Sequence, residues 1–170
     1  MKKVFSILTA IVLLVQLSGC GAYQIMTADS NRIDEMSEEI IRCLIEKDRD
    51  ALEALFCHQV SGILAFEAQM DALYAFFDYD YFFRYDINGS HAESDSTEYG
   101  ERVQWSVCAE IVYIEVFDES LDDSRFYCIT YNWTPVYQED SSLVGLHTVT
   151  VHLLNTDQQV TLGTCEYFPF

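Results

Sequence analysis

Residues 31–56 read NRIDEMSEEIIRCLIEKDRDALEALF, and this stretch sets the first half of the fold. Between residues 31 and 47 the apolar side chains recur at spacings of three and four positions, which is typical of an amphipathic helix. The apolar set is Ile33, Met36, Ile40, Ile41, Leu44 and Ile45. Charged residues occupy the opposite face. The sequence therefore predicts a helix over residues 31–47 with one buried face.

The pattern breaks at Lys47 and Asp48, directly before a second short apolar repeat. Aspartate is a favoured helix N-cap, so Asp48 or Asp50 can start a new helix over residues 49–56. A third stretch with the same apolar spacing covers residues 61–77. We therefore expect three helices in sequence.

After residue 78 the apolar pattern changes to one favouring strands. Residues 79–87 are aromatic and β-prone, whereas residues 88–100 are polar and predict a loop. Further strands are predicted where Val, Ile, Thr and aromatic residues concentrate, over residues 102–117, 125–137, 143–154 and 160–167. Helices followed by strands indicate an α+β domain, with helices packed on one face of an antiparallel sheet.

The acidic turn after residue 117 sets an expected hairpin register. If Phe117 pairs with Ser124, then Cys108 lies opposite Trp133 and far from Cys128 along the ladder, beyond disulfide reach. Besides Cys20 the chain has an odd number of cysteines, namely Cys43, Cys57, Cys108, Cys128 and Cys165. No C-x-x-C motif is present. We therefore expect small buried thiols rather than a disulfide framework, a zinc ribbon or a metal site.

Composition limits the class of protein. Half of the 170 residues are hydrophobic, so one domain with a real core can form. Nine basic residues stand against 28 acidic ones, and the net charge is −19. This charge opposes attraction to nucleic acid and to anionic bilayer surfaces.

The N-terminus reads as an export signal. Lys2 and Lys3 precede fourteen uncharged residues, 4–17, which is the length of a signal-peptide core and too short for a membrane span. Leu17-Ser18-Gly19-Cys20 then resembles a bacterial lipobox, in which cleavage after Gly19 exposes the cysteine that receives lipid. The alternatives are a buried first helix or a secretory signal cut after Ala22.

These features divide the chain into three parts. Residues 1–19 are expected to be a lipoprotein signal peptide, residues 20–30 the lipidated cysteine with a tether, and residues 31–170 a single α+β domain. Acyl chains on Cys20 would then hold the protein on the outer face of the bacterial cytoplasmic membrane.

Two stretches together carry a family resemblance. One is residues 40–56, IIRCLIEKDRDALEALF, and the other is Val144-Gly145-Leu146 at the start of a late strand. With the lipobox, they resemble an uncharacterised family of Gram-positive lipoproteins whose domain is similar to the nuclear-transport-factor-2-like (cystatin-like) fold. The resemblance implies a cone, with a strongly curved sheet around the long helix and a pocket at its mouth. Relatives with that fold include binding modules, isomerases, dehydratases and dimerisation domains, so the fold does not define the function.

Aromatic residues supply the expected pocket lining. Trp105, Tyr113, Tyr131 and Trp133 could form an apolar floor with polar tips. Among the four histidines, His147 is the one we expect at such a pocket, because it shares a predicted strand face with apolar residues. Otherwise the histidines are expected to be structural or solvated.

Glu110 lies inside the longest predicted strand. Alternate residues of a strand share one face, and Glu110 falls on the face of Gln104 and Cys108. The opposite face, which carries Trp105 and Ile111, is apolar enough to be the core. The expected reading is an outward, solvated carboxylate. The alternative, which a β-bulge would permit, is an inward carboxylate of raised pKa that acts as a base.

We expect a tethered binding or interaction module for a small molecule or protein, with no cofactor and without catalysis. One alternative is a pocket enzyme, similar to an isomerase or dehydratase, that uses Glu110 or His147 for proton transfer. The other is a structural module that forms homodimers through the outer sheet face.

Overall fold

The computed structural model describes residues 28–169 except residues 80, 88 and 119–121. The chain divides into two compact units, Met1–Met36 and Ser37–Phe170. In the first unit, residues 28–36 are helical. The predicted signal peptide, with Gly19 and Cys20, lies outside the described residues. Among those described, no helix is long and apolar enough to span a membrane.

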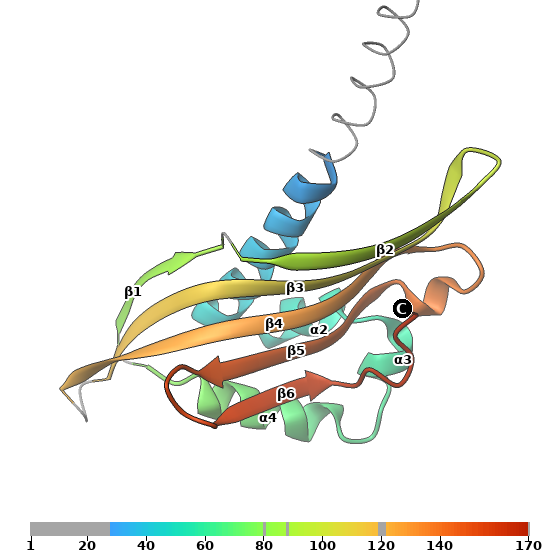
Figure 1. Ribbon diagram of the computed structural model, residues 1–170. Coiled ribbons are helices and arrows are strands. Elements are labelled where there is room, and N and C mark those ends of the chain that lie inside the picture. The colour runs from blue at the N-terminus through green and yellow to red at the C-terminus, as the bar shows by residue number, and fades with distance from the viewer. Residues whose placement is uncertain (1–27, 80, 88, 119–121, 170) are drawn as a thin grey trace, which may run out of the picture. The chain divides into compact units, whose positions relative to one another are not determined.

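The second unit is an α+β domain, as the sequence predicts (Figure 1). Its helical part comprises residues 37–46, α2 (Arg49–Leu55), α3 (His58–Ser61) and α4 (Phe66–Phe76). The strands are β1 (Tyr81–Asp86), β2 (His91–Glu98), β3 (Glu101–Asp118), β4 (Asp123–Tyr137), β5 (Gly145–Leu153) and β6 (Gln159–Gly163). A 3-10 turn, η1 (Ser141–Leu143), precedes β5.

The break at Lys47 and Asp48 is a tight reversal between two helices. Lys47 has a positive φ of 54°, the left-handed conformation that commonly ends a helix. Asp48 then caps α2, because its side chain accepts a hydrogen bond from the backbone amide of Ala51 at 3.1 Å. The predicted N-cap is confirmed at Asp48.

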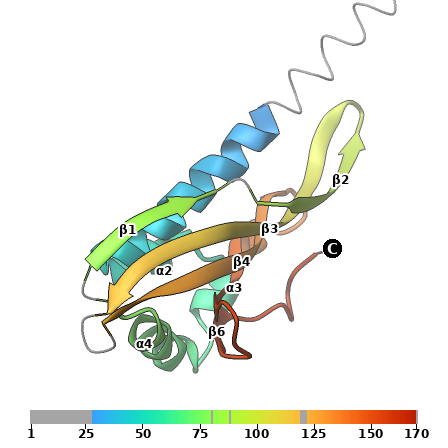
Figure 2. The same ribbon diagram turned by 60° about the vertical axis from the view of Figure 1, so that its left-hand side comes forward.

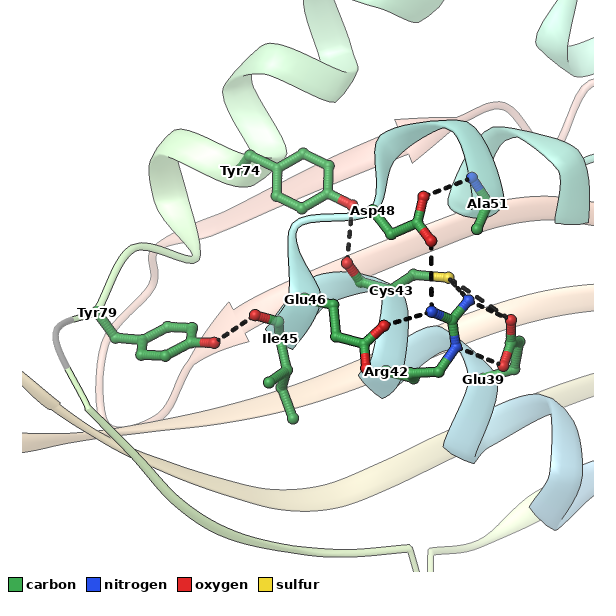
Figure 3. Close-up of polar contacts among 9 residues, drawn as sticks. All are labelled: Glu39, Arg42, Cys43, Ile45, Glu46, Asp48, Ala51, Tyr74 and Tyr79. Carbon is green, nitrogen blue, oxygen red and sulfur yellow. Dashed lines mark hydrogen bonds and ion pairs between the residues drawn. The ribbon is translucent and has the colours of Figure 1, made fainter.

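Two tyrosines satisfy carbonyl groups at the end of the first helix (Figure 3). Tyr74 donates its hydroxyl to the carbonyl of Cys43 at 3.1 Å, and Tyr79 donates to that of Ile45 at 2.8 Å. Beside them Arg42 binds the carboxylates of Glu39 and Glu46, both at 2.6 Å. Helix ends otherwise leave their last carbonyls without partners inside the helix. These contacts fix the helical layer as one block.

The predicted third helix over residues 61–77 is wrong in its first turn. Residues up to Ser61 belong to the short α3, which ends at Gly62, and α4 starts at Phe66. From there α4 buries Phe66, Met70 and Leu73, which are spaced by four and three positions on one face. Apolar spacing alone could not reveal the turn that separates the two helices.

Six strands of the described residues form one antiparallel sheet in the order β1-β3-β4-β5-β6. β2 also pairs with β3, so that β1 and β2 follow one another along the same edge of the long strand β3. The expected loop over residues 88–100 is therefore wrong, since residues 91–98 form β2. The helices lie together on one side of the sheet (Figure 2).

The β3–β4 hairpin keeps the predicted pairing of Phe117 with Ser124. Between Ile111 and Ile114 the register shifts by one residue, which is a β-bulge in β3. Cys108 therefore faces Asn132 rather than the predicted Trp133. Residues beyond the bulge change sides of the sheet.

The two faces of the sheet differ sharply in chemistry. The helix face carries the apolar cross-strand pairs, including Val107 with Trp133, and Ile129 with Val151. The outer face carries polar pairs: Cys108 with Asn132, Glu110 with Thr130, Asn132 with Thr148, and Thr150 with Thr161. Residues paired across two strands lie on the same face of the sheet, so the pairing shows on which face each side chain lies.

The two stretches that carry the family resemblance meet in space. Phe56, which follows α2, forms a parallel bridge with Leu146 in β5. The amide of Cys57 donates to the carbonyl of Leu146 at 2.9 Å. Gly145 permits this approach, because a Cβ atom there would lie 2.5 Å from the Cys57 nitrogen.

Candidate functional site

A groove of about 370 Å³ opens on the outer face across β2, β3 and β4. We call it the outer-face groove. Its lining residues are Ser90, His91, Ala92, Cys108, Ala109, Glu110, Thr130, Tyr131 and Asn132. Glu110, Thr130 and Asn132 supply hydrogen-bonding groups within a lining that exposes more apolar than polar surface, so the groove is suited to a ligand with both polar and apolar parts.

Glu110 supplies the carboxylate of the groove. Its side chain is half-buried, and both oxygens are engaged. The Ser90 hydroxyl donates to Oε2 at 3.2 Å, and the Cys128 thiol donates to Oε1 at 3.2 Å. The backbone amide of Glu110 also donates to the carbonyl of Ser90 at 3.0 Å. This carboxylate is held in place by neutral donors, and it retains lone pairs for a ligand.

Asn132 organises the other end of the groove. Its Oδ1 accepts from the Cys108 thiol at 2.7 Å. Its Nδ2 donates to the Thr148 hydroxyl at 2.7 Å and contacts the Cys165 sulfur at 3.2 Å. One amide thus joins β3, β4, β5 and the residues that follow β6.

Burial favours the protonated form of two thiols near the groove, those of Cys108 and Cys128. Burial raises the pKa of Cys108, and burial together with the neighbouring Glu110 raises the pKa of Cys128 to about 12. Elsewhere burial raises the pKa of Cys43 to about 11. A resting thiolate nucleophile at these three residues is therefore disfavoured. No group of three His, Cys, Asp or Glu side chains converges to hold a metal within the described part of the chain.

A smaller hollow, of about 230 Å³, lies between the ends of β3 and β4. Its lining includes Glu98, Gln104, Tyr137 and Glu139. The charge of Glu139 raises the pKa of the Tyr137 hydroxyl. Glu98 and Glu139 thus give the smaller hollow an acidic lining, in line with the net charge of the whole chain.

On the helix face, acidic side chains from the edge strand β2 contact the core aromatics. Glu93 accepts a hydrogen bond from the Trp105 indole nitrogen at 2.7 Å and lies 3.1 Å from His91 Nε2. Arg102 lies over the Trp105 ring, 4.7 Å from its centroid, and binds Asp95 at 3.2 Å. Charged side chains that point inward from an edge strand prevent edge-to-edge pairing with another sheet.

The expected aromatic pocket residues lie in different places. Trp105 and Trp133 are buried together with ring centroids 5.6 Å apart. Tyr131 is buried beside them, and its hydroxyl lies 2.8 Å from that of Ser37. The three residues share the helix face, where their rings fill the space between sheet and helices.

Tyr113 lies away from these three. Because of the bulge in β3, Tyr113 does not follow the alternation that places Trp105 on the helix face. The centroid of its ring lies 5.4 Å from that of Phe126. The Arg84 guanidinium lies 5.6 Å from the Tyr113 ring centroid.

His147 is fully buried near the start of β5. It is an extra residue in the β4–β5 ladder, because Trp133 pairs with Leu146 while Asn132 pairs with Thr148. Its Nε2 lies 3.0 Å from the Leu143 carbonyl. Burial lowers the pKa of this imidazole. His147 lines neither of the two hollows described above.

Sequence reasoning missed most of the groove. Ser90 and Ala92 fell in the expected loop, and Asn132 stands out in the sequence only as the first residue of Asn132-Trp133-Thr134, a glycosylation sequon that does not indicate a groove. The available signal was the polar phase of β3 and β4, where Cys108, Glu110, Thr130 and Asn132 alternate with the core residues.

The fold and the groove together define an α+β domain with a hollow on the outer face of its open sheet. Residues 39–157 match the family described as a domain of unknown function, DUF5104. The chain belongs to this family. No curated protein matches the chain.

Proposed function

We propose that this chain is an extracytoplasmic bacterial lipoprotein whose nuclear-transport-factor-2-like domain binds a small polar molecule in the outer-face groove. Cys20 is the proposed lipid attachment site, and the protein would reside on the outer face of the cytoplasmic membrane. The match to DUF5104 supports the resemblance at the level of an uncharacterised family.

The observation that carries the proposal is the half-buried Glu110 carboxylate in a groove of about 370 Å³. Thr130 and Asn132 lie along the same wall and supply further hydrogen-bonding groups. The chain has a net charge of −19, which disfavours anionic ligands. The favoured ligand is therefore neutral or cationic and rich in hydrogen-bond donors.

The same geometry favours binding over the two alternatives. Ser90 and Cys128 hold the two Glu110 oxygens in fixed positions, which suits binding of a hydrogen-bond donor and requires no proton transfer. The outer face displays threonine, asparagine and glutamate pairs rather than a contiguous apolar patch of the kind that marks a dimer surface.

The binding proposal is tested by native mass spectrometry of the full chain, gently extracted from its own membranes. We expect a small molecule to co-purify with the protein and to be lost from the Glu110→Gln variant. Glu101→Gln is the matched control, because it removes the same charge from the exposed start of β3, outside the groove. A ligand-free wild-type protein, or a ligand retained by Glu110→Gln, would contradict the proposed site.

Anchoring is tested separately by detergent phase partitioning of cells that express the full chain. We expect the wild-type protein in the detergent phase and the Cys20→Ala variant in the aqueous phase or retained as an uncleaved precursor. A Cys20→Ala variant that is cleaved and still partitions into detergent would contradict the lipoprotein proposal.

A further inference from the structure

The C-terminal segment, residues 164–169, crosses the outer face beside the groove. The amide of Thr164 donates to the carbonyl of His147 at 2.9 Å. At the far end, the Pro169 carbonyl accepts hydrogen bonds from Gln104 at 2.9 Å and from Ser106 at 2.6 Å. Between these two attachments, residues 165–167 are exposed. The segment is thus tied at both ends and open to solvent in its middle.

Cys165, in the open part of the segment, lies close to Cys108 of β3. Both sulfur atoms contact the same amide, since Cys108 donates to Asn132 Oδ1 at 2.7 Å and Cys165 lies 3.2 Å from Asn132 Nδ2. The oxygen and nitrogen of an amide are about 2.2 Å apart, so the two sulfurs lie within about 8 Å of each other. Cys165 also contacts Thr148 at 3.9 Å.

The other cysteines are poorly placed to compete. Cys43, Cys57 and Cys128 are buried, and the Cys128 thiol is directed to Glu110. Cys165 is exposed, and Cys108 is half-buried at the rim of the groove. The pair therefore combines an accessible thiol with a second thiol held nearby on a rigid strand.

We propose that Cys108 and Cys165 are a reversible disulfide site that fastens the C-terminal segment across the outer face. The oxidant is a small-molecule disulfide. Closing the bond requires the exposed segment to shift toward β3, because disulfide geometry needs the two Cα atoms within about 7 Å. The proposal goes beyond ligand binding and does not depend on it.

The chemistry is two thiol–disulfide exchanges. Cys165 gives up its proton, and its thiolate attacks one sulfur of the oxidant, breaking that S–S bond and releasing one small thiolate that takes up a proton. Cys108 then gives up its proton and attacks the Cys165 sulfur, which releases the second small thiolate. Two protein thiols are oxidised to one disulfide, and the oxidant is reduced to two thiols.

Cys165 reacts first because it is exposed, whereas burial raises the pKa of Cys108 and keeps it protonated. Once the disulfide forms, the Cys108 hydrogen bond to Asn132 is lost, and the groove wall carries a covalent link. The redox state would thereby change the surface that a ligand meets.

The test is peptide mapping of the full chain after exposure to oxidised glutathione. Reduced protein is freed of reductant, treated with glutathione disulfide, alkylated and digested without reduction. We expect a linked peptide pair that joins Cys108 and Cys165. The melting temperature should rise by roughly 5–10 °C as the loop between the two residues closes.

Two variants define the outcome. Cys108→Ser should stop at a glutathione adduct on Cys165, whereas Cys128→Ser, the matched control on the same face, should still form the link. The proposal is overturned if wild-type protein accumulates the Cys165 adduct without the link. A link from Cys165 to another cysteine, or to a second chain, would overturn it equally.

Discussion

The Cys57 sulfur lies 3.9 Å from Nδ1 of His147, ninety positions further along the chain. The Leu143 carbonyl can only accept a hydrogen bond, so Nε2 of His147 carries the ring proton and Nδ1 faces the thiol as an acceptor. Two further residues enclose the imidazole. The Thr134 hydroxyl lies 3.1 Å from Nε2, and the centroid of the Phe168 ring lies 5.2 Å from that of His147. The imidazole is therefore held in its neutral form.

This enclosure predicts a pH dependence of stability. Burial lowers the folded-state pKa of His147 below its unfolded value of about 6.5. Below that pH the unfolded chain binds one more proton, so the free energy of unfolding should fall as pH drops, by at most about 1.4 kcal/mol per pH unit from this residue. Urea unfolding of the full chain between pH 7.5 and 5 measures the slope.

A variant isolates the contribution of His147. His147→Gln should flatten the slope even where the protein is less stable at every pH. An unaltered slope in His147→Gln would assign the pH dependence to other groups.

The cap of α2 should be measurable. Asp48→Ala removes the acceptor for the Ala51 amide and should lower the free energy of unfolding by about 1 kcal/mol. Asp48→Asn keeps a capping oxygen and should retain most of the stability, which separates the hydrogen bond from the charge. Equal losses in the two variants would mean that the ion pair with Arg42 at 3.4 Å matters more than the cap.

The buried hydroxyl pair of Ser37 and Tyr131 joins the N-terminal helix to β4. A double-mutant cycle with Ser37→Ala and Tyr131→Phe should give a coupling free energy of about 0.5–1.5 kcal/mol. The double variant should therefore be less destabilised than the sum of the two single variants. Strict additivity in denaturant unfolding would show that the two hydroxyls do not stabilise one another.

Gly145 should be intolerant of any side chain. Gly145→Ala places a Cβ against the backbone of Phe56 and Cys57, at a φ of +134°, and should cost about 2 kcal/mol or more. Gly100→Ala is the matched control, because φ is also positive (+86°) but the added Cβ meets nothing within 4 Å. Thermal unfolding should rank Gly145→Ala clearly below Gly100→Ala, and an equal effect would contradict the steric explanation.

Local patterns were sufficient for much of this fold. The break at Lys47 and Asp48, the long strand β3 and the pairing of Phe117 with Ser124 all follow from spacing and turn chemistry. β2 was missed because seven of its eight residues are exposed, which removes the alternation that identifies a half-buried strand.

The groove and the buried histidine depend on long-range geometry instead. Asn132 can contact Cys108, Thr148 and Cys165 together only because a bulge in β3 brings it opposite Cys108. The contact of Cys57 with His147 depends on the bridge between Phe56 and Leu146, which joins segments that are distant in the chain. Neither relationship leaves a local signature in the residues involved.

The bulge between Ile111 and Ile114 divides β3 into two halves. The alternate residues that face the core are odd-numbered in one half and even-numbered in the other. Up to Ile111 the odd-numbered residues face the core, and from Ile114 onward the even-numbered ones do. Deleting one residue at 112 or 113 would remove the extra residue, so that one regular register would run through both halves of β3 and each half would keep its partners in β4. Because the parity reverses at the bulge, the positions that face the helices in one half of β3 cannot be found in the other half by counting every second residue.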